Sequence, residues 1–125
     1  MDVTAAVEKS LRESGAQWRR VVPGEWGVTV PAGGWDLDVG VALRGGMLCV
    51  QAEVVGRSVV DPHALLRRNR ALRLVRFAHT AAGAVYVQGE VPEAAVTVAE
   101  VDRLLGLLVD AAEELRVAVA ASGAS

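Results

Sequence analysis

The sequence contains few cysteine, lysine and aromatic residues. Cys49 is the one cysteine among 125 residues, which excludes a disulfide within the chain and a metal site built on cysteines. Lys9 is the one lysine, so nearly all basic side chains are arginine. Only five residues are aromatic, and the three tryptophans among them precede Asp36. The tryptophans are therefore the first residues to consider for a binding role.

The sequence also lacks the features of an exported or membrane-bound protein. No basic segment followed by an apolar run stands at its start, so we expect no secretory signal. No apolar run reaches the roughly 18 residues needed to span a bilayer. The net charge of −2 provides no general attraction to nucleic acid. We therefore expect a cytoplasmic protein without a membrane partner.

No nucleophile motif, phosphate-binding loop or cluster of metal-ligating residues is present. His63 and His79 are isolated, which favours surface positions over metal binding or catalysis. Four acidic residues on neighbouring strands can do acid–base chemistry if one is buried, but strand alternation places them on a wet face: Asp36, Asp38, Glu53 and Glu90. We expect a protein that is not an enzyme and has no cofactor. A small-ligand-binding or enzymatic domain is the alternative.

What the sequence does contain is enough apolar material for one core. The hydrophobic fraction is 52%, in a chain of the usual size for a single domain. We expect one domain over residues 1–121 and a frayed tail over 122–125.

The first part of the chain predicts a helix followed by strands. Apolar residues at helical spacing and a closing glycine predict a helix over 3–14. Two β-like runs surround Pro23-Gly24: 18–22 and an alternating run near 26–30. Gly45-Gly46 then suits a tight turn between strands 35–43 and 47–55. Pairing across that turn creates one apolar face and one polar face, with these cross-strand pairs on the apolar side: Leu43 with Leu48, Val41 with Val50, Val39 with Ala52, and Leu37 with Val54.

The second part predicts a helix, a hairpin and a long final helix. Asp61-Pro62 is a typical helix start, for a helix over 62–71. A hairpin over 74–79 and 85–91 follows. Thr97 to Glu100 form a capping box before an apolar stripe that runs to Val119. The fold class is α+β: an antiparallel sheet of about five strands with helices packed on it, in the order α-β-β-β-α-β-β-α. The run near 26–30 is a further short strand if it pairs.

The stretch from Leu65 to Leu72, then Arg76-Phe77-Ala78, Val85-Tyr86-Val87 and Val91-Pro92, resembles the YbjN-type domain. In that family a leucine-rich helix with an asparagine precedes a hairpin that ends at a proline, and a Thr-capped helix follows. The family's fold is similar to that of type III secretion chaperones, which are small, dimeric and peptide-binding. The resemblance implies a non-enzymatic, chaperone-like or regulatory adaptor protein that holds a segment of a partner, as a homodimer. It implies dimer contacts in one region, at Leu65, Leu66, Leu72, Leu74 and Phe77.

Trp18, Trp26 and Trp35 are the candidate residues for partner binding. A buried tryptophan needs a partner for its indole N–H, whereas a surface tryptophan is a favoured anchor for a peptide. A partner strand that adds to an exposed sheet edge is one mode this fold supports. Val7 and Leu11 of the first helix then form the wall of the neighbouring groove.

Arginines gather in one segment, at Arg67, Arg68, Arg70, Arg73 and Arg76. A nucleic-acid site needs basic side chains on one face with stacking aromatics, and only Phe77 is near. We expect this charge patch to pair with the acidic final helix or with an acidic partner. An accessory nucleic-acid role is the second alternative.

Overall fold

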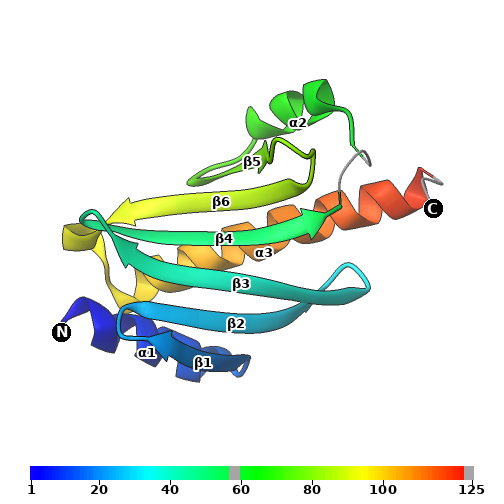
Figure 1. Cartoon of the computed structure of the whole chain (residues 1–125). Helices are drawn as coiled ribbons and strands as arrows, with labels where there is room; N and C mark the ends of the chain where they lie inside the picture. The colour runs from blue at the N-terminus through cyan, green and yellow to red at the C-terminus, as the bar shows by residue number, and fades with distance from the viewer. Residues whose placement is uncertain (57–59, 123–125) are drawn as a thin grey trace.

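The computed structural model describes residues 1–56 and 60–122. It consists of one six-stranded antiparallel sheet and three α-helices (Figure 1). The strand order in the sheet is β1-β2-β3-β4-β6-β5. The elements are α1 (Val3–Ser14), β1 (Gln17–Val22), β2 (Glu25–Ala32), β3 (Trp35–Arg44), β4 (Met47–Val55), α2 (Pro62–Asn69), β5 (Val75–His79), β6 (Val85–Pro92), the short 3-10 helix η1 (Glu93–Ala95) and α3 (Val98–Ala121).

The predicted α+β class and the order of the elements are confirmed. The sheet has six strands instead of about five, because the run near 26–30 is a full strand, β2, that pairs along its length with β3. The frayed tail was predicted over 122–125. Ser122 caps α3 through its N–H, which donates to the Ala118 carbonyl at 3.0 Å, and residues 123–125 lie outside the described residues.

The β3–β4 hairpin follows the predicted register. Gly45 and Gly46 both have positive φ, at 57° and 77°, as a two-residue hairpin turn requires. Leu43 pairs with Leu48, and the ladder then runs through Val41–Val50 to Val39–Ala52. The fourth expected pair, Leu37 with Val54, lies beyond this ladder, although both side chains are buried.

One face of the sheet carries the hydrophobic core, because α1 and α3 both cover it (Figure 1). Inward side chains of the strands meet the buried stripe of α3, which includes Val101, Leu104 and Leu108. The side chain of Asp2 caps α1 and that of Thr97 caps α3, each by accepting a hydrogen bond from a first-turn N–H. The opposite face of the sheet is open in the described chain and carries polar and short side chains. None of the described helices combines the length and the apolarity needed to cross a bilayer.

The two edges of the sheet differ. α2 lies along β5, and the Asn69 side chain at the end of α2 occupies the outer side of that strand. Asn69 Nδ2 donates to the Phe77 carbonyl at 3.1 Å, and Asn69 Oδ1 accepts from the Phe77 N–H at 2.7 Å. The side-chain amide therefore takes the place of a neighbouring strand. The β1 edge has no such cover among the described residues.

A buried arginine joins α3 to the β2–β3 turn and to the end of β4. Arg116 is 3% exposed. Its Nε donates to the Val54 carbonyl at 2.8 Å, and its Nη1 donates to Ala32 and Trp35 carbonyls at 3.0 Å each and to the Asp36 carbonyl at 3.3 Å. Burial lowers the pKa of Arg116, and the Asp38 carboxylate opposes that change. The guanidinium thus fixes the β2–β3 turn and the end of β4 on α3.

Candidate functional site

An apolar groove lies between α1 and α3, over the inner face of β2 and β3. We call it the α1–α3 groove. Its volume is about 430 Å³. Leu11, Val28 and Val39 are buried at its floor. Its accessible apolar lining consists of four half-buried side chains and a helical glycine: Ala16, Val30, Leu105, Val109 and Gly106. The groove can hold apolar side chains from outside the chain.

The polar residues at this groove are two serines and three carboxylates. Glu13, Asp102 and Asp110 are exposed and line it from both helices. Ser10, which is buried, donates a short hydrogen bond from its hydroxyl to Asp102 Oδ1 and so ties α1 to α3. No lysine, arginine or histidine contributes to the lining. The rim of the groove is therefore uniformly acidic.

Gly106 lies in the middle of α3, on the surface of the groove. A glycine inside a helix costs about 0.5–1 kcal/mol relative to alanine. Apart from its chain neighbours and the adjoining helix backbone, no described atom lies within 4 Å of a Cβ added at Gly106, so packing does not require a glycine there. What the glycine does provide is bare helix backbone facing the groove.

We expect Gly106→Ala to raise the free energy of unfolding by about 0.5–1 kcal/mol, since it removes the entropic penalty without a clash. Urea unfolding followed by circular dichroism measures this change. Gly89→Ala is the contrasting control, because a Cβ there would lie 2.6 Å from the Leu74 carbonyl oxygen and must destabilise the chain. If Gly106→Ala instead lowers the free energy of unfolding, the folded state itself requires glycine at this position.

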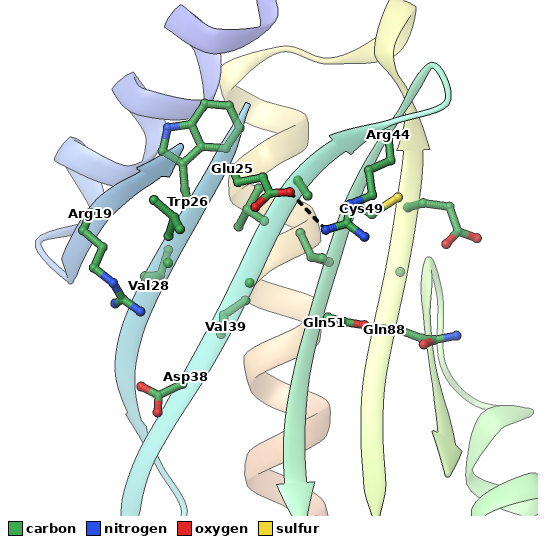
Figure 2. A pocket seen from close by; sticks show the side chains of 18 residues that line it. Arg19, Glu25, Trp26, Val28, Asp38, Val39, Arg44, Cys49, Gln51 and Gln88 are labelled. Carbon is green, nitrogen blue, oxygen red and sulfur yellow. Dashed lines mark hydrogen bonds and ion pairs between the residues drawn. The ribbon is translucent and has the colours of Figure 1, made fainter. Parts of the chain in front are cut away.

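A second hollow lies on the open face of the sheet and has a volume of about 470 Å³ (Figure 2). Gly27, Gly40 and Ala42 make its floor flat, and longer side chains border it: Arg19, Asp38, Arg44, Gln51 and Gln88. Two of these polar groups are engaged by neighbouring side chains. Arg44 Nη2 lies 3.1 Å from Glu25 Oε1, and Asp38 accepts from Thr29 at 2.9 Å. The hollow is wide and does not bring a set of reactive groups together.

Trp26 is a core residue, contrary to the prediction that it binds a partner. It is 1% exposed, and its indole N–H donates to Glu8 Oε2 at 2.9 Å. Glu8 also accepts from Arg20 Nε at 2.8 Å, so one carboxylate joins α1 to β1 and β2. The hydrogen bond from Arg20, and to a lesser extent the one from Trp26, lowers the pKa of Glu8 below its ordinary value of 4.5. The partner for the buried indole is supplied by the chain itself.

The other proposed partner-binding residues are divided. Val7 is fully buried and unavailable to a partner, which corrects its assignment as a groove wall. Leu11 is 1% exposed and contributes only to the floor of the α1–α3 groove. Trp18 is half-buried and packs against the core from β1. Trp35 is 50% exposed at the start of β3, where its ring lies 4.2 Å from the Arg116 guanidinium carbon. The three tryptophans therefore form no common surface.

The proposed dimer residues also separate into core and surface. Leu65 and Phe77 are 3% and 6% exposed and so offer little surface for a dimer contact. Leu72 is partly buried against the core. Leu66 is 64% exposed on α2, and Leu74 is 37% exposed just before β5. Leu74 has a positive φ of 63°, an uncommon backbone for a bulky residue.

The arginine patch does not form the expected ion pairs with the final helix. Arg76 pairs with Glu90 of β6 at 3.2 Å, and no ion pair within the described residues joins the other four to α3. Arg68 lines a shallow hollow together with Asp110, Glu113 and Glu114, beyond ion-pair distance. Arg67, Arg70 and Arg73 are exposed. Most of the patch is therefore exposed.

The candidate chemical groups do not gather into a reactive site. His63 and His79 are exposed, and Cys49 is half-exposed on the open face. Asp36 and Glu53 are exposed on that same face, where Glu90 pairs with Arg76. Within residues 1–56 and 60–122, no three histidine, cysteine or acidic side chains lie close enough to hold a metal ion.

Sequence reasoning named Leu11 but missed the other residues that line the α1–α3 groove. Leu105 and Val109 belong to the apolar stripe of α3, and an apolar stripe on a helix usually indicates burial. Gly106 between them is the one local signal, because glycine is unfavourable inside a helix. The groove itself depends on how two helices far apart in the sequence pack beside each other on the sheet.

The fold is similar to that of solved type III secretion chaperones. A chain of the crystal structure of the ExsC–ExsE complex is similar over 93% of this chain and 95% of its own, with a TM-score of 0.68 and 22% identity. The Yersinia pestis type III secretion chaperone SycH, solved in complex with a stable fragment of YscM2, is similar over 88% of this chain and 96% of the other, with a TM-score of 0.61 and 15% identity.

A chain of the heterodimeric ExoU–SpcU complex from the type III secretion system of Pseudomonas aeruginosa is also similar. It covers 89% of this chain and 94% of its own, with a TM-score of 0.61 and 17% identity. No protein-family model and no curated protein sequence matches. The likeness is therefore one of fold.

Proposed function

We propose that this protein is a non-enzymatic, chaperone-like module that holds a segment of a partner protein in the α1–α3 groove. The observation that carries the proposal is the groove itself: apolar, uncovered, about 430 Å³ in volume and bordered by helices that the core holds in place. A concave apolar site with few polar groups is suited to binding, whereas catalysis needs converging reactive groups. The ExsC–ExsE, SycH–YscM2 and ExoU–SpcU structures, which share the fold, are all complexes of two proteins. The resemblance to YbjN-type domains is in keeping with this proposal.

The uncovered β1 edge extends the same site. Ala16 lines the groove and Gln17 is the first residue of β1, so the groove ends where the strand begins. The β5 edge is occupied by Asn69, which leaves β1 as the edge that can accept an added strand from a partner. Val21 and Val22 of β1 are 54% and 48% exposed. A partner segment that leaves the groove can therefore continue along β1.

Photo-crosslinking in the native cell tests this function. A photoreactive phenylalanine analogue placed at Val109 is expected to trap a discrete protein, because this side chain lines the groove. The same analogue at Glu53, exposed on the open face, is the control and is expected to trap none. Equal labelling from both positions, or no product from Val109, contradicts the proposal.

We further propose that the protein acts as a homodimer through the α2 side of the molecule. Leu66 is exposed on α2. Leu74 is also exposed, and its backbone is in the left-handed region. An uncommon backbone conformation that persists is a reason to consider a functional role. Both residues lie on the side opposite the β1 edge, so dimer and partner do not compete.

We expect Leu66→Glu to convert a dimer into a monomer in sedimentation velocity, because it buries a charge in the contact. Its effect on the free energy of unfolding of the monomer should stay within about 0.5 kcal/mol, as for other exposed positions. Val21→Glu, also at an exposed apolar residue but on the opposite β1 edge of the sheet, is the matched control and should leave the dimer intact. A monomeric wild-type protein contradicts this part of the proposal.

A further inference from the structure

The charged side chains that line the α1–α3 groove are all acidic, although Asp110 also lines a separate hollow with Arg68, beyond ion-pair distance. Glu13 comes from α1, and Asp102 and Asp110 come from α3, so carboxylates border the apolar lining on two sides. Among residues 1–56 and 60–122, none of these three carboxylates forms an ion pair. Asp102 accepts a hydrogen bond from the neutral Ser10 hydroxyl, which leaves its charge uncompensated.

The nearest basic residues in the sequence do not neutralise this rim. Arg103 follows Asp102, but it lies outside the lining and its Nη1 is 3.7 Å from Glu100 Oε1. Arg12 precedes Glu13 and is also absent from the lining. Like charges beside an apolar wall concentrate the electrostatic potential in the groove. An acidic segment that entered it would meet repulsion from both helices.

We propose that the partner segment held in the α1–α3 groove is apolar with lysine or arginine residues beside the apolar ones. The apolar side chains contact Val30, Leu105 and Val109, and the basic ones pair with Glu13, Asp102 and Asp110. The inference rests on the proposed function and adds the chemistry of the partner. Charge complementarity of this kind selects among partners more than it adds affinity, because the wrong sign is rejected.

Gly106 supports a close approach of that segment. It lies between Leu105 and the next turn that carries Val109 and Asp110, so the bare backbone of α3 is in the middle of the acidic rim. The absence of any described atom within 4 Å of its Cβ position leaves room for a partner atom against the helix. A basic side chain that crosses α3 at this glycine can reach the carboxylates on both sides.

Two short synthetic peptides test the inference. Both carry the same leucine and alanine centre, with lysines at the flanks of one and glutamates at the flanks of the other. Fluorescence anisotropy with the full chain at about 0.05 M salt should show the lysine peptide binding about tenfold more tightly, and about 0.5 M salt should reduce that ratio. Glu13→Gln combined with Asp110→Asn should weaken the lysine peptide by about fivefold and bring the ratio close to one.

Asp38→Asn combined with Glu53→Gln is the matched control, because it removes two exposed carboxylates from the open face. It should leave the ratio of affinities unchanged. Equal affinity of the two peptides for the wild type, or a ratio that survives neutralisation of Glu13 and Asp110, overturns the inference. So does the failure of both peptides to bind up to about 1 mM, a concentration that corresponds to about 4 kcal/mol of binding free energy. The proposed function is tested by a different experiment: it is contradicted when a crosslinker at Val109 traps no protein, whatever the peptides do.

Discussion

Replacing Arg116 with methionine is expected to lower the free energy of unfolding by about 3 kcal/mol, the largest effect we expect of a single polar residue here. The substitution keeps the apolar stem and removes the donors to four carbonyl oxygens, those of Ala32, Trp35, Asp36 and Val54. A buried acceptor left without a donor costs about 1–3 kcal/mol, and water can reach some of these oxygens once the turn relaxes. Urea unfolding of both proteins measures the difference.

Two other arginine substitutions sharpen this test. Arg116→Lys keeps the charge but cannot reach several carbonyls at once, because lysine lacks the planar fork of donors. It should recover only part of the loss. Arg103→Met, at a position 54% exposed on the same helix, should change the free energy of unfolding by about 0.5 kcal/mol or less. A loss below about 1 kcal/mol for Arg116→Met would mean that the turn is held by its own hydrogen bonds.

Glu8→Ala is expected to cost about 2 kcal/mol, because it leaves the buried indole N–H of Trp26 without an acceptor. Glu13→Ala, an exposed acidic residue on the same helix, is the control and should cost little. Combining Glu8→Ala with Trp26→Phe removes both partners. In that double-mutant cycle the two effects should be clearly non-additive, and additive effects would contradict the assigned bond.

The Glu8 contribution should also depend on pH. The pKa of Glu8 is lowered in the folded chain, so its contribution to stability is fully present above its ordinary pKa of 4.5. It is lost as the pH falls through the lower, folded value. The difference in unfolding free energy between the wild type and Glu8→Gln should therefore shrink as the pH is lowered from about 7 to about 3. A difference that stays constant over this range would exclude a charged Glu8 as its source.

The hairpins and helix ends could be predicted because their signals are local. Gly45-Gly46 and the alternation around it determine both the turn and the pairing of β3 with β4. Asp61-Pro62 and Thr97 likewise mark helix starts through contacts within a single turn. Such features depend only on residues close in the sequence.

β2 was harder to predict as a full strand. Its apolar alternation covers only residues 26–30, and Pro31 within it pairs with Asp36 although proline is unusual inside a strand. β1 is exposed along most of its length, so an apolar pattern hardly marks it. Pairing with better-defined neighbours stabilises both strands.

The roles of individual polar and aromatic residues depend on distant partners, which the sequence does not reveal. Trp26 can be buried because Glu8 of α1, 18 residues earlier in the sequence, accepts a hydrogen bond from its indole N–H. Arg116 has no local sign of burial beyond its position beside Leu115. Asn69 stood out only through the resemblance, and its contact with Phe77 requires the fold of the second hairpin.

The central claim is tested most directly with the partner protein that the photo-crosslinker at Val109 traps. The measurement is the affinity of that partner for variants of this chain at Gly106. Gly106→Leu places a side chain in open space inside the α1–α3 groove, so it should leave the chain folded while it fills the site. We expect the partner to bind Gly106→Leu at least about tenfold more weakly than the wild type, a change of about 1.4 kcal/mol, with Gly106→Ala intermediate. Unchanged affinity for Gly106→Leu would show that the partner binds elsewhere.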